Sequence, residues 1–197
     1  MKKIFITSLI TGLLIYMFFL LSNCKQSTEP GEKDETGLVV PGVGMDGVKL
    51  GDTLETVLKK LGGPSSTALA DGLYRSWSAY FYDDGPHAGL EIDFIDKPDG
   101  SIGIVDLILV GSSPHSKDSY TGKTKEGIGL GSTLKEVHNV YGSPDTTLHF
   151  SDITRINDIY CFGQNHFEIA YKDSVTSGFS IGFYKPMTRD PLYNCCK

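Results

Sequence analysis

The sequence lacks the short motifs on which most catalytic and cofactor sites are built. It has no glycine-rich phosphate loop, no serine nucleophile elbow and no zinc-helix motif. Its five histidines are scattered, and the serine, histidine and aspartate residues show no strand–turn context that would assemble a triad. We therefore expect no cofactor, no metal and no enzymatic activity.

Basic residues are also scarce. The chain has 18 Lys and Arg against 24 Asp and Glu. Residues 1–23 hold Lys2 and Lys3 and no acid, so their removal would leave 16 bases against 24 acids, a net charge of −8. This balance argues against a nucleic-acid partner, which needs basic patches. It also argues against adsorption of the folded part to anionic lipid.

The first residues have the pattern of an export signal. Lys2 and Lys3 precede an almost unbroken apolar run from Ile4 to Leu21, and a small residue follows it. This arrangement is typical of a secretory signal peptide, which we place at 1–23. The alternative is an uncleaved transmembrane helix, because the run is long for a signal peptide.

The end of this run, Leu21-Ser22-Asn23-Cys24, resembles the lipobox of bacterial lipoproteins. Asn23 departs from the usual small residue and is closer to the looser spirochaete-type lipobox. The resemblance implies cleavage before Cys24 and acylation of that residue, including palmitate, which would anchor the chain in a membrane. Lys25 in place of aspartate argues against retention in the inner membrane. The outer membrane is therefore the favoured location, with the periplasmic or the outer face left open.

Three further cysteines remain, and three is an odd number for disulfide pairing. Export permits disulfides. Cys195 and Cys196 are adjacent, and adjacent cysteines rarely bridge each other because the ring is strained. Cys161 could therefore pair with either of them.

One stretch of sequence occurs twice, at 48–64 and at 128–144. Seven identities fall in one ungapped window, at positions 50/130, 51/131, 53/133, 54/134, 57/137, 62/142 and 64/144. Each copy predicts a short helix. Thr53 and Thr133 are N-cap candidates, and Glu136 completes a capping box with Thr133. Gly62 and Gly142 are placed to end the helices.

Strand-like segments follow each copy of the helix. They are Leu73–Tyr82, Leu90–Asp96 and Ile102–Val110 in the first half, and 159–162, 167–171 and 178–184 in the second. The predicted fold class is α+β: two tandem repeats, each a short helix plus about three antiparallel strands, in one sheet with the helices on one face. The predicted segments are a lipidated flexible tether (24–45), repeat 1 (46–112), a linker (113–126) and repeat 2 with a C-terminal tail (127–197).

The repeated motif is similar to the SmpA/BamE-like lipoprotein domain and to the tandem repeats of the beta-lactamase-inhibitor protein. The matching residues are Leu50, Gly51, Thr53, Val57, Gly62 and Pro64, with Leu130, Gly131, Thr133, Val137, Gly142 and Pro144. Those families bind proteins and do not catalyse, so the resemblance implies a non-catalytic protein-binding module. The inhibitor's intradomain disulfides are not matched, so recognition of beta-lactamase is not implied.

The candidate protein-binding residues are Tyr74, Trp77, Tyr80 and Tyr82, since exposed Tyr and Trp are common interface anchors. The alternative is that every second one belongs to the sheet core. Two other functions stay open. One is a small-ligand site between the repeats, which needs an apolar cavity.

The other alternative is an envelope hydrolase that uses Asp83, Asp84 or Asp93. The acidic turn before His87 could also bind a metal, although an ordinary hairpin tip is the simpler interpretation. His138, on the second helix, is expected to be a partly buried core residue, and His149 and His166 have no evident partner.

Replacing Cys24 by alanine is expected to release the protein from the membrane, because the thiol is the predicted site of acylation. Mass spectrometry of the native membrane-bound protein should show a chain that begins at Cys24 and carries acyl groups. A mature chain that keeps residues 1–23 would contradict this prediction.

Overall fold

The computed structural model describes residues 35–71, 76–111, 120–150 and 155–183. The predicted signal peptide, Cys24, Tyr74, Cys195 and Cys196 lie outside these ranges. Within them, no helix is both long and apolar enough to cross a membrane. Apart from the predicted tether, whose described residues are discussed below, the domain boundaries given above stay predictions.

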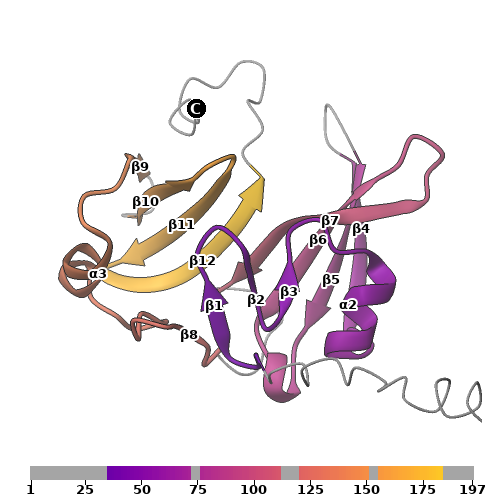
Figure 1. The fold of residues 1–197 in the computed structure, drawn as a ribbon, viewed down its shortest axis with the longest axis horizontal. Helices are drawn as coiled ribbons and strands as arrows, with labels where there is room; N and C mark the ends of the chain where they lie inside the picture. The colour runs from indigo at the N-terminus through magenta and orange to yellow at the C-terminus, as the bar shows by residue number, and fades with distance from the viewer. Residues whose placement is uncertain (1–34, 72–75, 112–119, 151–154, 184–197) are drawn as a thin grey trace, which may run out of the picture. The chain divides into compact units, whose positions relative to one another are not determined.

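The main element is one eight-stranded antiparallel sheet in the order β4-β5-β6-β7-β12-β11-β10-β9 (Figure 1). The first four strands are β4 (Ser66–Asp71), β5 (Ser76–Tyr82), β6 (Leu90–Asp96) and β7 (Ile102–Val110). The others are β9 (Thr146–Phe150), β10 (Arg155–Phe162), β11 (Asn165–Lys172) and β12 (Val175–Phe183). The class is α+β, as predicted, and the structure is dominated by strands.

Each half contributes four strands to this sheet rather than the predicted three. The sequence analysis missed β4 as a separate strand because Ser-Thr-Ala-Leu-Ala-Asp has few large apolar residues and no clear alternation. It missed β9 because this segment is also an edge strand, where packing constrains only one side. The first predicted strand, Leu73–Tyr82, corresponds to β5, and its first three residues lie outside the described ranges.

The two predicted helices are present as α2 (Leu54–Leu61) and α3 (Leu134–Tyr141). Thr53 caps α2 by accepting from the Thr56 N–H, and Thr133 forms the predicted capping box with Glu136. Both helices end at a glycine with positive φ, 80° at Gly62 and 76° at Gly142, which only glycine adopts without strain.

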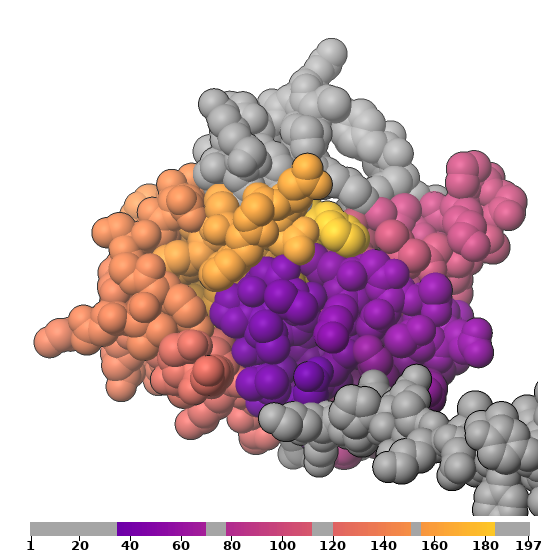
Figure 2. Space-filling model, in the orientation of Figure 1, coloured from indigo at the N-terminus to yellow at the C-terminus, as the bar shows by residue number. Residues whose placement is uncertain are grey.

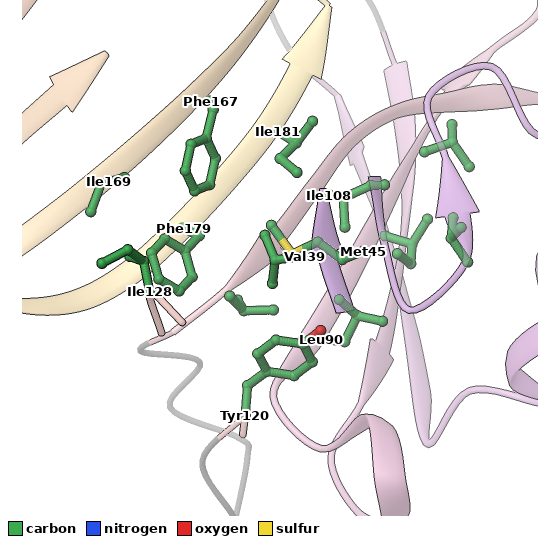
Figure 3. Packing of buried hydrophobic residues seen from close by; sticks show 14 of the residues in the cluster. Val39, Met45, Leu90, Ile108, Tyr120, Ile128, Phe167, Ile169, Phe179 and Ile181 are labelled. Carbon is green, nitrogen blue, oxygen red and sulfur yellow. The ribbon is translucent and has the colours of Figure 1, made fainter. Parts of the chain in front are cut away.

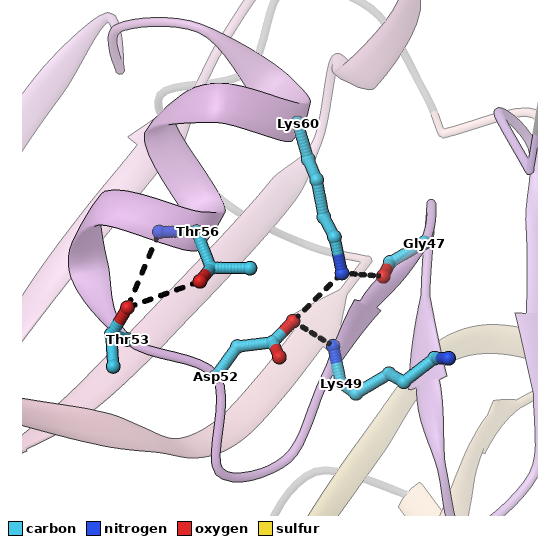
Figure 4. Close-up of polar contacts among 6 residues, drawn as sticks. All are labelled: Gly47, Lys49, Asp52, Thr53, Thr56 and Lys60. Atoms are coloured by element: carbon cyan, nitrogen blue, oxygen red, sulfur yellow. Dashed lines mark hydrogen bonds and ion pairs between the residues drawn. The ribbon is translucent and has the colours of Figure 1, made fainter. Parts of the chain in front are cut away.

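A lysine fixes the end of α2 to the turn that precedes the helix (Figure 4). Lys60 Nζ lies 3.0 Å from Asp52 Oδ2 and donates to the Gly47 carbonyl at 2.6 Å. Asp52 also accepts from the Lys49 N–H at 2.9 Å. The second helix has no lysine at the equivalent position, which is Val140.

Both helices pack on the same face of the sheet. Residues paired directly across neighbouring strands share a face, and one such row runs Tyr82–Leu90–Val110–Phe179–Ile169–Asp158. Tyr82 Oη donates to the carbonyl of Gly62 at the end of α2, whereas Asp158 contacts His138 of α3 at 2.7 Å. The two ends of one row therefore contact the two helices.

This face holds a single hydrophobic core (Figure 3). Phe94, Ile108, Phe167, Ile169 and Ile181 on the sheet are fully buried, as are Val57 of α2 and Val137 of α3. The buried rings of Phe167 and Phe179 stack at 5.5 Å. Because side chains of both halves belong to one cluster, the two halves are stabilised together.

A second, four-stranded sheet covers part of the core in the order β3-β2-β1-β8. Its strands are β1 (Leu38–Val40), β2 (Gly44–Met45), β3 (Val48–Lys49) and β8 (Lys123–Thr124). The sequence analysis assigned 38–45 to a flexible tether, and the structure corrects this. Val39 and Met45 are fully buried because they supply core side chains from this sheet.

Asp46, at the turn after β2, connects four segments of the chain. It is buried, with φ of 52°. Its carboxylate accepts from Tyr120 Oη at 2.6 Å and from the Gly37 N–H at 2.8 Å, and contacts His87 Nδ1 at 2.6 Å. Burial, followed by the nearby Asp46 charge, raises the pKa of Tyr120 far above its usual range, so the phenol stays a donor.

Asp46→Ala is expected to lower the free energy of unfolding by about 3–5 kcal/mol, since it leaves buried donors without an acceptor. Asp173→Ala is the matched control, because Asp173 also has positive φ, 54°, but is exposed. The control should cost about 1 kcal/mol, from the left-handed backbone alone. Equal losses in a chemical denaturation experiment would contradict the assigned role of Asp46.

Candidate functional site

The side of the eight-stranded sheet opposite α2 and α3 carries the candidate site. We call it the helix-free face and define it by residues of two paired rows. One row contains Phe81, Glu91, Leu109, Ser180 and Glu168, and the other contains Asp93, Leu107 and His166. All eight side chains are half-buried.

Acidic and apolar side chains alternate across this face. Glu91 and Asp93 lie on β6, Glu168 lies on β11, and Leu107 and Leu109 lie between them on β7. Three strand spacings separate β6 from β11, about 14 Å. Two carboxylates acting on one glycosidic bond are about 5 to 10 Å apart, so Glu91 and Glu168 are not placed as such a pair.

The two glutamates differ in how they are held. Burial raises the pKa of Glu91, and a hydrogen bond with Asp93 acts in the opposite direction. Glu168 accepts a short hydrogen bond from Asn157 Nδ2 and a longer one, 3.4 Å, from Ser180 Oγ. Neighbouring donors therefore fix the carboxylate of Glu168, whereas the carboxyl group of Glu91 is partly buried next to a second acid, Asp93.

The ring of His166 lies close to Gly182 on the neighbouring strand β12. A Cβ added at Gly182 would lie 2.7 Å from His166 Cε1 and 2.8 Å from Leu107 Cδ1. The missing side chain thus lets His166 and Leu107 meet across β12. Burial lowers the pKa of His166, while the charges of Glu168 and Asp106 partly oppose this. Its Nδ1 atom has no hydrogen-bond partner among the described residues.

The predicted aromatic binding residues are not brought together on this face. Tyr82 is buried and Tyr80 is half-buried, with its ring edge against Phe94 at 5.1 Å on the helix side. Burial raises the pKa of Tyr82 to about 12. These two tyrosines belong to the core, which is the alternative that the sequence left open. Trp77 pairs with Ile95 along the backbone, and its binding role stays a prediction, as does that of Tyr74.

The acidic turn before β6 serves the local structure. Asp83 donates its N–H to Ser65 Oγ at 2.9 Å, and Ser65 Oγ donates to Asp84 Oδ1 at 3.4 Å. His87 Nδ1 contacts Asp46 Oδ2 at 2.6 Å. Among the described residues, no group of three His, Cys, Asp or Glu side chains is arranged to bind a metal ion.

The remaining candidates are two histidines and a cysteine of the second half. His138 is half-buried, as predicted, and contacts Asp158, which also accepts from Thr147 Oγ1 at 2.7 Å. His149 is exposed on β9. Cys161 is disulfide-bonded, and the other cysteines of the chain lie outside the described ranges, so the choice between Cys195 and Cys196 stays open.

The sequence contains a signal for the two glutamates. Leu90-Glu91-Ile92 and Phe167-Glu168-Ile169 occupy matching positions in the two halves. An acid between two core residues at both positions indicates a shared polar row. What the sequence does not give is the pairing of β7 with β12, which places the two acids on one surface.

His166→Gln is expected to reduce the acid sensitivity of the fold. A histidine whose folded pKa lies below the unfolded value of about 6.5 costs stability as pH falls through that range. The melting temperature should therefore fall less between neutral and mildly acidic pH in the variant than in the parent protein. His149→Gln, on the exposed edge strand, is the control and should behave as the parent; an unchanged pH profile for His166→Gln would contradict the assignment.

No protein-family model matches the chain, and no curated protein sequence matches it. Solved structures that are similar in part include a DUF4309 family protein from Bacillus subtilis (15% identity, TM-score 0.41, covering 66% of this chain and 78% of that one). A cysteine-rich secretory protein from Staphylococcus aureus is 9% identical, with a TM-score of 0.44. The match covers 68% of this chain and 43% of that one. A candidate beta-lactamase inhibitor protein from Streptococcus mutans is 14% identical, with TM-score 0.25 and coverages of 66% and 82%. All three TM-scores are too low to assign a family or to transfer a function.

Proposed function

We propose that this chain is a lipid-anchored, non-catalytic module of the bacterial cell envelope that binds another protein on its helix-free face. The observation that carries the proposal is the composition of that face, where half-buried apolar side chains alternate with carboxylates and none of the helices in the described residues covers the sheet. Protein interfaces combine an apolar centre with polar groups that select the partner in this way. The anchor is the acyl group predicted on Cys24.

The charges of the face indicate the chemistry of the partner. Glu91, Asp93 and Glu168 are acceptors when ionised, and among the eight residues that define the face only His166 can supply a positive charge. A partner segment rich in lysine, arginine or backbone donors would complement them. Leu107 and Leu109, between the acids, would contact the apolar part of that segment.

We further propose that the chain arose by duplication of a helix-and-strand unit. Equivalent hydrogen bonds in the two halves support this. The N–H of Gly51 donates to the carbonyl of Val105 at 2.9 Å, and that of Gly131 donates to Thr176 at 2.9 Å. Tyr82 and Tyr160 donate at 3.3 Å to the glycines that end α2 and α3. Duplication would explain why an acid occurs on both sides of the face.

Photo-crosslinking from single positions tests the proposed surface. A photoreactive residue at Leu109, in full-length protein in native membranes, should give an adduct with one protein partner. The same residue at Lys59, exposed on α2, is the control and should give no such adduct. Adducts of equal yield at both positions, or none at Leu109, would contradict the proposed surface.

Charge removal tests the partner chemistry separately. The double variant Glu91→Gln/Glu168→Gln should lose the Leu109 adduct, because the acceptor charges are gone while the side-chain shapes remain. Glu55→Gln/Glu126→Gln removes two exposed charges elsewhere and should leave the yield unchanged. Persistence of the adduct in the first variant would show that the carboxylates do not select the partner.

A further inference from the structure

The outer face of the four-stranded sheet has a composition unlike the rest of the protein. Val39, Met45 and Val48 point into the core, so their neighbours Leu38, Val40 and Lys49 lie on the opposite side. Lys123, paired with Leu38, also lies there and is exposed. Figure 2 shows residues near position 40 on the surface of the molecule.

Two exposed apolar side chains lie beside this face, Val43 in the turn between β1 and β2 and Phe162 at the end of β10, against that turn. Val43 and Phe162 are 42% and 41% exposed, and Val40 is 36% exposed. Phe162 packs against Gly42, where an added Cβ would be 2.4 Å from Phe162 Cβ. Asn165 Nδ2 donates a hydrogen bond to the Gly42 carbonyl at 2.7 Å. Three of the eight large apolar side chains exposed in the described residues thus surround one turn.

The two lysines of this face are available for an external partner. No ion pair joins Lys49 or Lys123 to any described carboxylate. Asp52, which accepts from the Lys49 N–H, is already paired with Lys60. In a chain with an overall excess of acid, the face is therefore locally basic as well as apolar.

The position of the face in the chain identifies its partner. β1 is the first described strand, and Leu38 follows Cys24 by 14 positions. The eleven residues 24–34 belong to the segment predicted from sequence to be a tether, and a tether of that length would span roughly 18 Å on average. An acyl group on Cys24 would thus keep this end of the protein next to the bilayer.

We infer that the outer face of the small sheet, formed by Leu38, Val40, Val43, Lys49, Lys123 and Phe162, docks on the anionic headgroup surface of the membrane that holds the anchor. The lysines contact phosphate groups, and the apolar side chains enter the boundary between headgroups and acyl chains. The net charge of the whole chain argued against such contact, but the charge of this face is opposite. The inference rests on the proposed anchor and leaves the helix-free face for the protein partner.

Fluorescence quenching by lipid tests the docking. The acylated Val43→Trp protein is reconstituted in vesicles of brominated phosphatidylcholine, with and without phosphatidylglycerol. The fluorescence emission of the Val43→Trp protein should lie at shorter wavelength and be more strongly quenched than that of the parent protein. Both effects should be larger in vesicles that contain phosphatidylglycerol. Leu69→Trp is the control, since Leu69 is 71% exposed on the edge strand β4, and its emission should match that of a tryptophan in water.

Charge reversal in the Val43→Trp protein completes the test. Lys49→Glu/Lys123→Glu should abolish the added quenching, whereas Lys59→Glu/Lys135→Glu, on the exposed sides of the helices, should not. Quenching at position 43 no stronger than at position 69, in protein that co-floats with the vesicles, would overturn the docking while leaving the anchor intact. Shielding from aqueous iodide without quenching by lipid would show that a protein covers the face, which also overturns it. Failure to co-float would remove the anchor, and the inference with it.

Discussion

The pairing of β7 with β12 is the contact on which the rest of the structure depends. Each is the last strand of its half, and Ile108 opposite Ile181 places two fully buried side chains at the centre of the joint. Without this pairing, each half would be a four-stranded meander with a short helix, too small to bury an adequate core. With it, the two halves share one sheet and one hydrophobic cluster.

That pairing also divides the molecule into two chemically different sides. On one side, α2, α3 and the small sheet exclude water from the core, and buried carboxylates such as Asp46 and Asp158 are matched by donors. On the other, no described helix covers the strands, and acids remain between apolar residues. The helix side therefore holds carboxylates that serve the fold, whereas the helix-free face holds the carboxylates proposed to recognise a partner.

Charge is distributed unevenly over these surfaces. The acids Glu91 and Glu168 lie on the helix-free face, whereas Lys49 and Lys123 lie on the outer face of the small sheet. A net charge describes neither surface, because electrostatic recognition depends on the groups within about a Debye length, roughly 8 Å at physiological salt. An anchored protein with this distribution could hold one surface toward lipid and offer another to a protein.

The sequence by itself determined the local structure. Threonine caps, terminal glycines and helical periodicity located α2 and α3, because these signals act within a few residues. The alternation of apolar and polar residues located β6, and the strand-like segments of the second half located most of β11 and β12, for the same reason. Only the tertiary structure decided which strands pair. It also placed Val39 and Met45, predicted to lie in a tether, in the core. Finally, it turned Tyr82 toward the core and placed Glu91 and Glu168 on one surface. Those outcomes depend on contacts between residues far apart in the chain, such as Asp46 with Tyr120, whose energy no local pattern encodes.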